Sequence, residues 1–265
     1  MTDARPTDWN AEVYDRIGTP MRGWAQQLID DLGLRGDETV LDAGCGSGSV
    51  TLDLLTKLPR GKVYAVDSSP DMIEKLAATL AERGIPNVVP LVASLTGFTL
   101  PEPVDVVFSN AVFHWIPDDD GLFGSLARAT KPGGRLRAQC GGAGNIDRLM
   151  EATHAVEKHP SYVDYFAAES EFRKYRTVEE ARAAMQRNGW TDVRGRLFPA
   201  PVTFEDDDSA ALYLRTIILQ HQAKALPDEF SGRFLHEVIA ETVHRFGAPF
   251  VADYVRLDLW ATRGA

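Results

Sequence analysis

A glycine-rich turn between an apolar segment and a helical segment is the feature that most constrains how this chain can fold. Residues 40–48 run from valine and leucine through an aspartate into three glycines at alternate positions. Glycine carries no Cβ, so the backbone can turn sharply there and a ligand can approach it closely. In open α/β sheets, ligands bind at such turns, outside the carboxyl ends of the strands. We therefore expect a parallel sheet with a ligand site at this turn.

Short apolar runs alternate with helical segments through the first half of the chain. Five segments of this half are predicted strands: Thr39–Leu41, Lys62–Val66, Val88–Val92, Val104–Ser109 and Arg135–Cys140. Two further strands are predicted in the second half, Val193–Phe198 and Tyr254–Thr262. Helical segments lie between the first five strands, near Val50–Leu58, Pro70–Arg83 and Gly121–Thr130. This alternation predicts a doubly wound α/β fold, which is a parallel sheet with helices on both faces.

Local signals mark the ends of one helix and the start of the fifth strand. Ser69 followed by Pro70 is typical of a helix N-cap with proline at the first helical position. Gly84 is placed to end the same helix. Residues 131–134, Lys-Pro-Gly-Gly, predict a tight turn that leads into the fifth strand.

The chain divides into three regions. Residues 1–36 read as a helical lead-in, residues 37–144 as the α/β core, and residues 145–265 as the remaining strands with additional helices. The helical segments expected in the last region are Ile146–Lys158, Ser161–Ala168, Val178–Asn188, Ser209–Ala225 and Asp228–Phe246. Those near 145–175 and 205–248 exceed what completing the sheet requires, so we interpret them as a cap over the ligand site.

An aspartate at the end of the second strand is the second signal for a nucleoside ligand. Asp67 lies 21 residues after Gly46, and an acid at that place can accept hydrogen bonds from both hydroxyls of a ribose. The dinucleotide pattern requires a third glycine three residues after the second, where this chain has Ser49. Asp42 would also repel a pyrophosphate, so a cationic or amino-bearing ligand is favoured. A βα turn with a solvent-facing Asp67 and no ligand is the structural alternative.

The same motifs resemble a known enzyme family. Residues 40–48 resemble motif I of the class I S-adenosylmethionine-dependent methyltransferases, residues 67–72 their second motif, and residues 131–134 the turn before their fifth strand. Residues 109–118 are similar to the fourth-strand motif of the trans-aconitate methyltransferase-like branch, and residues 253–257 look like its last strand. The resemblance implies a Rossmann-like sheet of seven strands and S-adenosyl-L-methionine as the cofactor. It also implies methyl transfer to a carboxylate or hydroxyl oxygen of a small molecule.

The resemblance also implies roles for individual residues. Asp42 would lie near the amino end of the cofactor, Asp67 would hold the ribose, and Ser68 and Met72 would flank the adenine. The family usually has an acid where this chain has Ser94, whose hydroxyl can still accept one hydrogen bond. The full set of expected cofactor-binding residues is Tyr14, Asp42, Gly44, Cys45, Gly46, Gly48, Asp67, Ser68, Met72, Ser94, Leu95 and Asn110.

His114 and Trp115 follow the fourth strand and are the expected catalytic positions. In one interpretation Trp115 forms a wall near the transferred methyl group and His114 is a substrate contact or general base. In the other, aromatic side chains pack under the cap and His114 is hydrogen-bonded to the backbone. A carboxylate acceptor needs no base, because it is already ionised at neutral pH.

The cap segments carry both cations and large apolar side chains. The cations Arg173, Lys174, Arg176, Arg215 and Lys224 could capture an acidic substrate, or form exposed ion pairs on an acidic protein. The apolar side chains could form a small core of the cap or a pocket for a hydrophobic natural product. N- or C-methylation of such a substrate is therefore an alternative, as are a nicotinamide-dependent oxidoreductase and a non-catalytic cofactor-binding regulator.

Composition excludes several other classes. The chain has 28 Lys and Arg against 38 Asp and Glu, a net charge of −10, with no basic block, which argues against nucleic acid or membrane lipid as a partner. Its two cysteines form no disulfide framework, and its first residues lack an apolar leader. Its apolar runs are too short to span a bilayer. A cytoplasmic location is therefore expected. Its six histidines show no metal-ligand spacing, so no metal site is expected.

Overall fold

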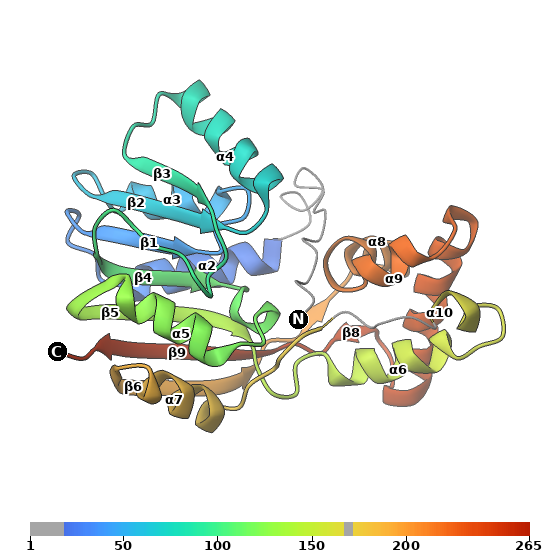
Figure 1. Cartoon of the computed structure of the whole chain (residues 1–265). Coiled ribbons are helices and arrows are strands. Elements are labelled where there is room, and N and C mark those ends of the chain that lie inside the picture. The colour runs from blue at the N-terminus through green and yellow to red at the C-terminus, as the bar shows by residue number, and fades with distance from the viewer. Residues whose placement is uncertain (1–18, 167–171) are drawn as a thin grey trace.

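A seven-stranded sheet forms the centre of the computed structural model, which describes residues 19–166 and 172–265 (Figure 1). The strand order is β3-β2-β1-β4-β5-β9-β6, in which β9 runs antiparallel to β5 and β6 and the other pairs are parallel. The strands are β1 Thr39–Ala43, β2 Lys62–Asp67, β3 Val88–Val92, β4 Val104–Asn110, β5 Thr130–Gly141, β6 Trp190–Pro199 and β9 Val255–Arg263. The predicted mostly parallel, seven-stranded α/β fold is confirmed.

Helices cover both faces of the sheet. The first three described helices, α2 Thr19–Asp31, α3 Ser49–Thr56 and α4 Pro70–Arg83, bury their apolar faces in one cluster with side chains of β1, β2 and β4. Two others, α5 Asp119–Arg128 and α7 Val178–Arg187, pack with the opposite face of the sheet. Leu28 and Leu32 of the lead-in are buried, while Trp24 lies half-buried against Tyr254.

The predicted ends of α4 are confirmed in detail. The Ser69 hydroxyl accepts a hydrogen bond from the amide of Met72, Pro70 is the first helical residue, and Gly84 takes a φ of +62°. The tight turn predicted at residues 131–134 lies inside β5 and not before it. Thr130 already pairs with Val104, and the pairing resumes between Arg135 and Val106. Gly133 takes a φ of +77°, as a turn with glycine at this position requires.

The remaining helices gather at one end of the sheet, beyond the carboxyl ends of its parallel strands (Figure 1). They are α6 Asp147–Glu157, α8 Asp207–Tyr213, α9 Gln220–Ala225 and α10 Asp228–Phe246, next to a short ladder of β7 Val202–Thr203 with β8 Val251–Ala252. They share their own apolar cluster, to which Leu149, Leu214 and Phe234 contribute. This group of helices is called the cap below.

Two predicted helices differ in the structure. Within the described part of Ser161–Ala168 there is a single 3-10 turn, Val163–Tyr165. The continuous helix expected over Ser209–Ala225 is interrupted by the π-helical segment Leu214–Ile218, in which the amide of Leu219 donates to the carbonyl of Leu214. One extra residue in that turn changes the direction of the chain, and periodicity in the sequence does not reveal it.

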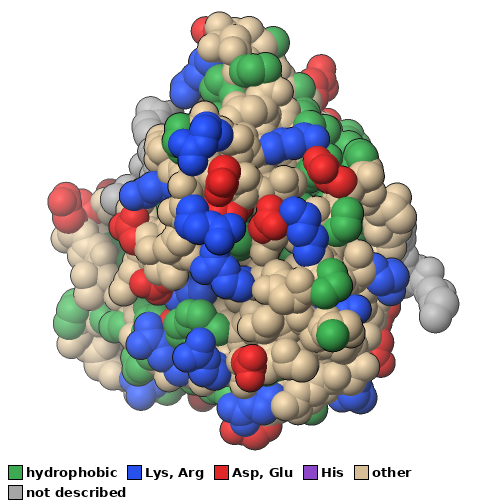
Figure 2. All heavy atoms as spheres, turned by 90° about the vertical axis from the view of Figure 1, so that its left-hand side faces the viewer, with side chains coloured by type: hydrophobic (Ala, Val, Ile, Leu, Met, Phe, Trp, Pro, Cys, Tyr) green, Lys and Arg blue, Asp and Glu red, His purple; other side chains and the backbone are tan. Residues whose placement is uncertain are grey.

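At the end of the molecule opposite the cap, Lys and Arg side chains are interspersed with Asp and Glu (Figure 2). Two of the ion pairs at the amino ends of the strands are Lys62–Glu102 at 3.1 Å and Lys131–Asp105 at 2.8 Å. Exposed pairs of this kind contribute little to stability individually. In the described ranges, no helix combines the length and the apolar character needed to cross a membrane.

Candidate active site

The glycine turn after β1 adopts a backbone that only glycine accepts readily. Gly44, Gly46 and Gly48 have φ values of +85°, +53° and +87°. A Cβ on Gly44 would lie 2.3 Å from Val112, and one on Gly48 would lie 2.3 Å from Leu76. A Cβ on Gly46 would meet nothing within 4 Å. Glycine at 44 and 48 therefore permits close packing of neighbouring elements, and the space beside Gly46 is open.

The amides of the turn are directed into the protein. Gly44 and Cys45 both donate to the carbonyl of Val66, at 2.8 and 3.0 Å, and Gly48 donates to the carbonyl of Cys45 at 3.1 Å. Gly46 donates to Oδ2 of Asp67 at 2.9 Å. Loops that bind phosphate direct such amides at the ligand. Because these four donors are already engaged, the turn is poorly suited to a pyrophosphate. This agrees with the presence of Ser49 where the dinucleotide pattern requires its third glycine.

Asp67 joins the end of β2 to the glycine turn. Besides the bond from Gly46, its Oδ1 accepts from the amide of Ser69 at 2.9 Å, so the carboxylate also fixes the start of α4. The side chain is partly exposed, and each carboxylate oxygen can accept a further hydrogen bond. Gly46 and Asp67, which were predicted from their spacing of 21 positions, are therefore in direct contact. The carboxylate of Asp67 can still accept hydrogen bonds from hydroxyl groups of a ligand.

Asp42 lies buried beneath the turn. Its carboxyl accepts a hydrogen bond from the Thr51 hydroxyl at 2.7 Å. Burial, together with the negative charge of Asp67, raises the pKa of Asp42 from 3.8 to about 7, against the opposing effect of the Thr51 bond. A ligand cation near this carboxyl would favour its ionised form.

Replacing Asp42 by asparagine is expected to make the protein more stable at pH 8. Between pH 3.8 and about 7 the folded protein holds a proton that the unfolded chain has released, so stability falls as the pH rises through that window. The difference between the two pKa values corresponds to at most about 4 kcal/mol. The amide of the new side chain would keep an oxygen for the Thr51 bond without a charge. Urea unfolding at pH 4.5 and 8 should show a weaker loss of stability with pH in Asp42→Asn, whereas the exposed control Asp71→Asn should behave as wild type.

The other predicted cofactor residues lie around the same edge, with different exposures. Ser68 is exposed, and Met72 is buried in the first turn of α4. The Ser94 hydroxyl lies 2.9 Å from the hydroxyl of Thr96, and the side chain of Leu95 is buried in the main core cluster. Cys45 is buried, which raises the pKa of its thiol well above the usual value. Tyr14 lies outside the described residues.

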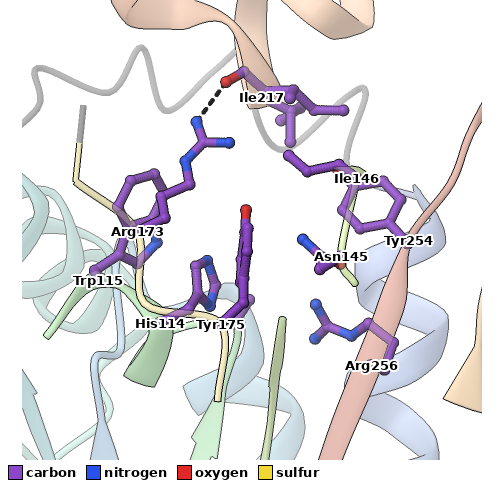
Figure 3. Close-up of a pocket in the computed structure, with 11 residues that line it drawn as sticks. His114, Trp115, Asn145, Ile146, Arg173, Tyr175, Ile217, Tyr254 and Arg256 are labelled. Carbon is purple, nitrogen blue, oxygen red and sulfur yellow. Dashed lines mark hydrogen bonds between the residues drawn. The ribbon is translucent and has the colours of Figure 1, made fainter. Parts of the chain in front are cut away.

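A pocket opens between the carboxyl ends of β4 and β5 and the cap (Figure 3). It is lined by Ala111, His114, Trp115, Asn145, Ile146, Arg173, Tyr175, Ile217, Ile218, Tyr254 and Arg256. His114 and Trp115 were predicted from the sequence, and both come from the 3-10 turn η1, Phe113–Trp115. The π-helical segment brings Ile217 and Ile218 to the opposite wall. Arg173 and Arg256 reach the pocket from opposite sides, with the hydroxyl of Tyr175 pointing in between them (Figure 3).

His114 is buried and neutral. Its Nδ1 accepts a hydrogen bond from the amide of Gly141 at 3.3 Å, which assigns the ring proton to Nε2. Burial lowers the pKa of His114 well below its usual value, and the positive charges of Arg256, Arg173 and Arg176 lower it further. The hydrogen bond from the Gly141 amide agrees with the interpretation that His114 is bonded to the backbone. The position of His114 at the pocket agrees with the interpretation that it is a substrate contact.

Arg256 is the pocket cation that was given no role from the sequence. Its Nε donates to Oε1 of Gln139 at 3.1 Å, and one terminal nitrogen donates to Oδ1 of Asn110 at 3.4 Å. Its guanidinium stacks on Trp24 with 4.6 Å to the ring centroid. The available signal was the pair of charged residues Arg256 and Asp258 between apolar residues of one strand, but the direction of Arg256 depends on pairing between strands far apart in the chain.

Of the five cap cations considered from the sequence, Arg173 is the one that lines the pocket. Its guanidinium lies 4.8 Å from the Trp115 ring centroid and donates to the carbonyl of Ile218, so it connects the core to the cap. Arg176 is buried and holds this segment in place through the carbonyls of Phe113 and Ile116. Lys174 pairs with Asp119 at 2.9 Å, and the other two are exposed: Arg215 and Lys224.

Comparison with known proteins bears on one part of this arrangement. Residues 40–134 match the family described as a methyltransferase domain. Over these residues the chain is similar to methyltransferase domains. The match covers the glycine turn, Asp67 and η1, while the pocket residues Arg173 and Arg256 lie outside it.

Curated relatives and solved structures are also similar to this chain. The chain is 34% identical over 131 residues to a trans-aconitate 2-methyltransferase of Azoarcus sp. strain BH72, covering 49% of this chain and 50% of that protein. It spans between 50% and 64% of the length of the first three curated relatives that it matches. Among solved structures, the YcgJ protein of Bacillus subtilis superposes with a TM-score of 0.65 at 16% identity, covering 92% of this chain and 99% of that one. A Haemonchus contortus phosphoethanolamine N-methyltransferase 2, in complex with S-adenosyl-L-methionine, gives 0.61 at 18% identity, covering 92% and 53%.

No three His, Cys, Asp or Glu side chains gather into a metal-binding group within the described residues.

Proposed function

We propose that this protein transfers the methyl group of S-adenosyl-L-methionine to a carboxylate oxygen of a small organic acid. The observation that carries the proposal is the pocket beside the glycine turn, where Arg173, Arg256 and the Nε2 hydrogen of His114 are donors. No Asp or Glu is among the described residues that line it. Guanidinium groups suit a carboxylate because their donors can form charge-assisted hydrogen bonds to both of its oxygens.

The residues around the glycine turn fit the proposed cofactor. Asp67 would accept hydrogen bonds from the ribose hydroxyls, and the open space beside Gly46 leaves room for the ligand. Asp42 and the engaged amides of the turn suit a ligand that carries a positive charge and no phosphate. When bound, S-adenosyl-L-methionine supplies a sulfonium methyl group that a carboxylate oxygen can displace.

The chain's own residues would then act by binding, orientation and exclusion of water. Arg256 and Arg173 would hold the carboxylate, which is already ionised and needs no general base. His114 would donate from Nε2, and its Nδ1 is engaged with Gly141, so a role as base for a hydroxyl acceptor is disfavoured. The apolar wall of Ile146 and Ile217 limits water around the reacting atoms. Alignment of this kind can supply about 7–11 kcal/mol of the barrier.

The first experiment measures which cofactor stabilises the protein. Thermal unfolding is followed with S-adenosyl-L-methionine, S-adenosylhomocysteine and NADH in separate samples. A ligand at 100 times its Kd stabilises by about 2.7 kcal/mol, which raises Tm by roughly 5–11 °C for a protein of this size. We expect a rise with the two adenosyl ligands only. A rise with NADH alone would contradict the proposal and favour an oxidoreductase.

The second experiment identifies the methylated atom. The protein is incubated with methyl-labelled cofactor and a panel of small acids that includes trans-aconitate, the compound named in several curated relatives. A methyl ester releases labelled methanol in mild alkali, whereas a methylamine or a methyl ether does not. Alkali-stable label in the product would contradict carboxylate methylation.

Replacing His114 by alanine is expected to lower kcat by about tenfold and leave the Kd for S-adenosylhomocysteine unchanged. The loss corresponds to one hydrogen bond to a charged group. The wild-type rate should also stay level as the pH falls from 8 to 6, because the pKa of His114 lies well below 6.5. A base with an ordinary pKa would instead lose activity below about 6.5. Steady-state kinetics test both statements, with the exposed His154→Ala as the control.

A further inference from the structure

The hydroxyl of Tyr175 points into the pocket, and within the described residues it has no hydrogen-bond partner (Figure 3). The ring of Tyr175 lies beside that of His114, with 5.8 Å between the ring centroids and 32° between the planes. A phenol hydroxyl can both donate and accept a hydrogen bond. Tyr175 therefore offers a bound acceptor a polar group in addition to the arginines and His114.

Two N–H donors lie next to this hydroxyl at the pocket. His114 carries its ring proton on Nε2, because Nδ1 accepts from the amide of Gly141. Asn145 is 3% exposed, and its Oδ1 accepts from the amide of Val255 at 3.0 Å, which leaves its Nδ2 hydrogens for other partners. Figure 3 shows these two side chains on either side of Tyr175. Both N–H groups can only donate, so together with the hydroxyl they suit a ligand with oxygen lone pairs, which an ammonium group does not have.

The backbone on both sides of Tyr175 is held by hydrogen bonds. The amide of Lys174 donates to the carbonyl of His114 at 2.8 Å, and the carbonyl of Arg176 accepts from the amide of Ala143 at 2.9 Å. Tyr175 is thus fixed between η1 and the chain that follows β5. A donor that is already in place loses little conformational freedom when a ligand binds.

Gly141, the last residue of β5, gives the three donors the space that they occupy. A Cβ at this position would lie 2.7 Å from Cε1 of Tyr175 and 3.0 Å from Nδ2 of Asn145. The same residue donates its amide hydrogen to Nδ1 of His114 at 3.3 Å. The lack of a side chain at Gly141 therefore lets Tyr175 and Asn145 approach each other, while its amide sets the tautomer of His114.

We propose that Tyr175 is an acceptor-binding residue whose hydroxyl donates to the acceptor's carboxylate beside the N–H groups of His114 and Asn145, and that Gly141 is the positioning residue that gives it room. This inference rests on the proposed function, because it takes that carboxylate as the ligand. The three donors carry no charge, so they act whatever partners the pocket arginines have. They favour an oxygen acceptor over an amine.

The first test is Tyr175→Phe, which removes the hydroxyl and keeps the ring against His114 and Gly141. KM for trans-aconitate should rise about tenfold or more, because a hydrogen bond to a charged group is lost. The same bond is made before and during methyl transfer, so kcat should change by less than about threefold. The Kd for S-adenosylhomocysteine should stay as in wild type. The control is Tyr165→Phe, an exposed tyrosine of the cap outside the pocket, which should change none of these constants.

The second test is Gly141→Ala, which keeps the amide bond to His114 and places a methyl group against the Tyr175 ring. Displacement of the ring should raise KM for trans-aconitate as Tyr175→Phe does. In the double variant the two effects should not multiply, because the alanine has already moved the hydroxyl that the phenylalanine removes. Gly23→Ala is the matched control, since a Cβ there would meet nothing within 4 Å.

Thermal unfolding of each variant separates loss of stability from loss of binding, and Tyr175→Phe decides alone where Gly141→Ala does not fold. A lower Tm with KM for trans-aconitate as in wild type would make Tyr175 a packing residue and overturn the inference. Effects that multiply in the double variant would overturn the positioning role of Gly141. If the wild type methylates no carboxylic acid, as measured by labelled methanol, the proposed function fails and the inference fails with it. Failure of the inference alone is therefore a distinct result, in which the wild type is active and Tyr175→Phe is unchanged.

Discussion

Asp67→Ala is expected to weaken the binding of S-adenosyl-L-methionine by more than about 100-fold. The carboxylate would lose two ribose hydroxyl donors, and a hydrogen bond to a charged group contributes about 1.5–3 kcal/mol. Two such bonds exceed the roughly 2.7 kcal/mol that corresponds to about 100-fold in affinity. The substitution also removes the acceptor for the amides of Gly46 and Ser69, so the glycine turn and the start of α4 lose a shared anchor.

Isothermal titration calorimetry with S-adenosyl-L-methionine and S-adenosylhomocysteine measures this loss directly. The control is Asp71→Ala, an exposed acid in the first turn of α4, which should bind both ligands as wild type does. The affinity of Asp67→Asn should fall between those of the two alanine variants, because the amide keeps one acceptor oxygen and has an NH2 donor in place of the other. Near-normal affinity in Asp67→Ala would exclude the assignment of this residue to the ribose.

Arg256→Ala is expected to reduce kcat/KM for a carboxylic acid by about 100- to 1,000-fold, with cofactor affinity nearly unchanged. The guanidinium is the pocket cation whose direction is most completely fixed, through Gln139, Asn110 and the stacking on Trp24. Loss of two charge-assisted hydrogen bonds in the transition state accounts for a change of that size. A methyl ester or an amide of the same acid should bind equally poorly to wild type and variant.

Two further variants make the test specific. Arg256→Lys keeps the charge but cannot form the same fork of donors, so we expect a partial loss. Arg215→Ala removes an exposed cation of the π-helical segment and should keep full activity. If the two alanine variants lose equal activity, the effect is one of overall charge, and the role of Arg256 as the acceptor's anchor is refuted.

Much of the core was predictable because its signals are local. The ends of α4 depend on Ser69, Pro70 and Gly84, which act on their own backbone and need no distant partner. The position of the turn at residues 131–134 inside β5 was not predicted, because it depends on the register of β5 with β4, which the local Lys-Pro-Gly-Gly pattern does not contain.

The cofactor side and the acceptor side of the site also differ in how much of them the sequence predicts. Gly46 and Asp67 were predicted together, because consecutive parallel strands bring their carboxyl ends to one edge and the spacing along the chain is then informative. Arg256 was not predicted, because it reaches the pocket only through the antiparallel pairing of β9 with β5. The protonation of His114 likewise depends on the amide of Gly141 and on burial under the cap.

The sequence alone determined the class of fold, the glycine turn and the acid that follows it, because periodicity, capping and turn geometry are properties of short stretches of chain. The tertiary structure decided which cations face the acceptor, which ones only hold the chain in place, and which tautomer His114 adopts. Those properties depend on distances between residues that are remote in sequence, as when Gln139 of β5 meets Asp258 and Arg256 of β9. Charge and hydrogen-bonding strength change steeply with burial and separation, so they arise only when the sheet and the cap have assembled.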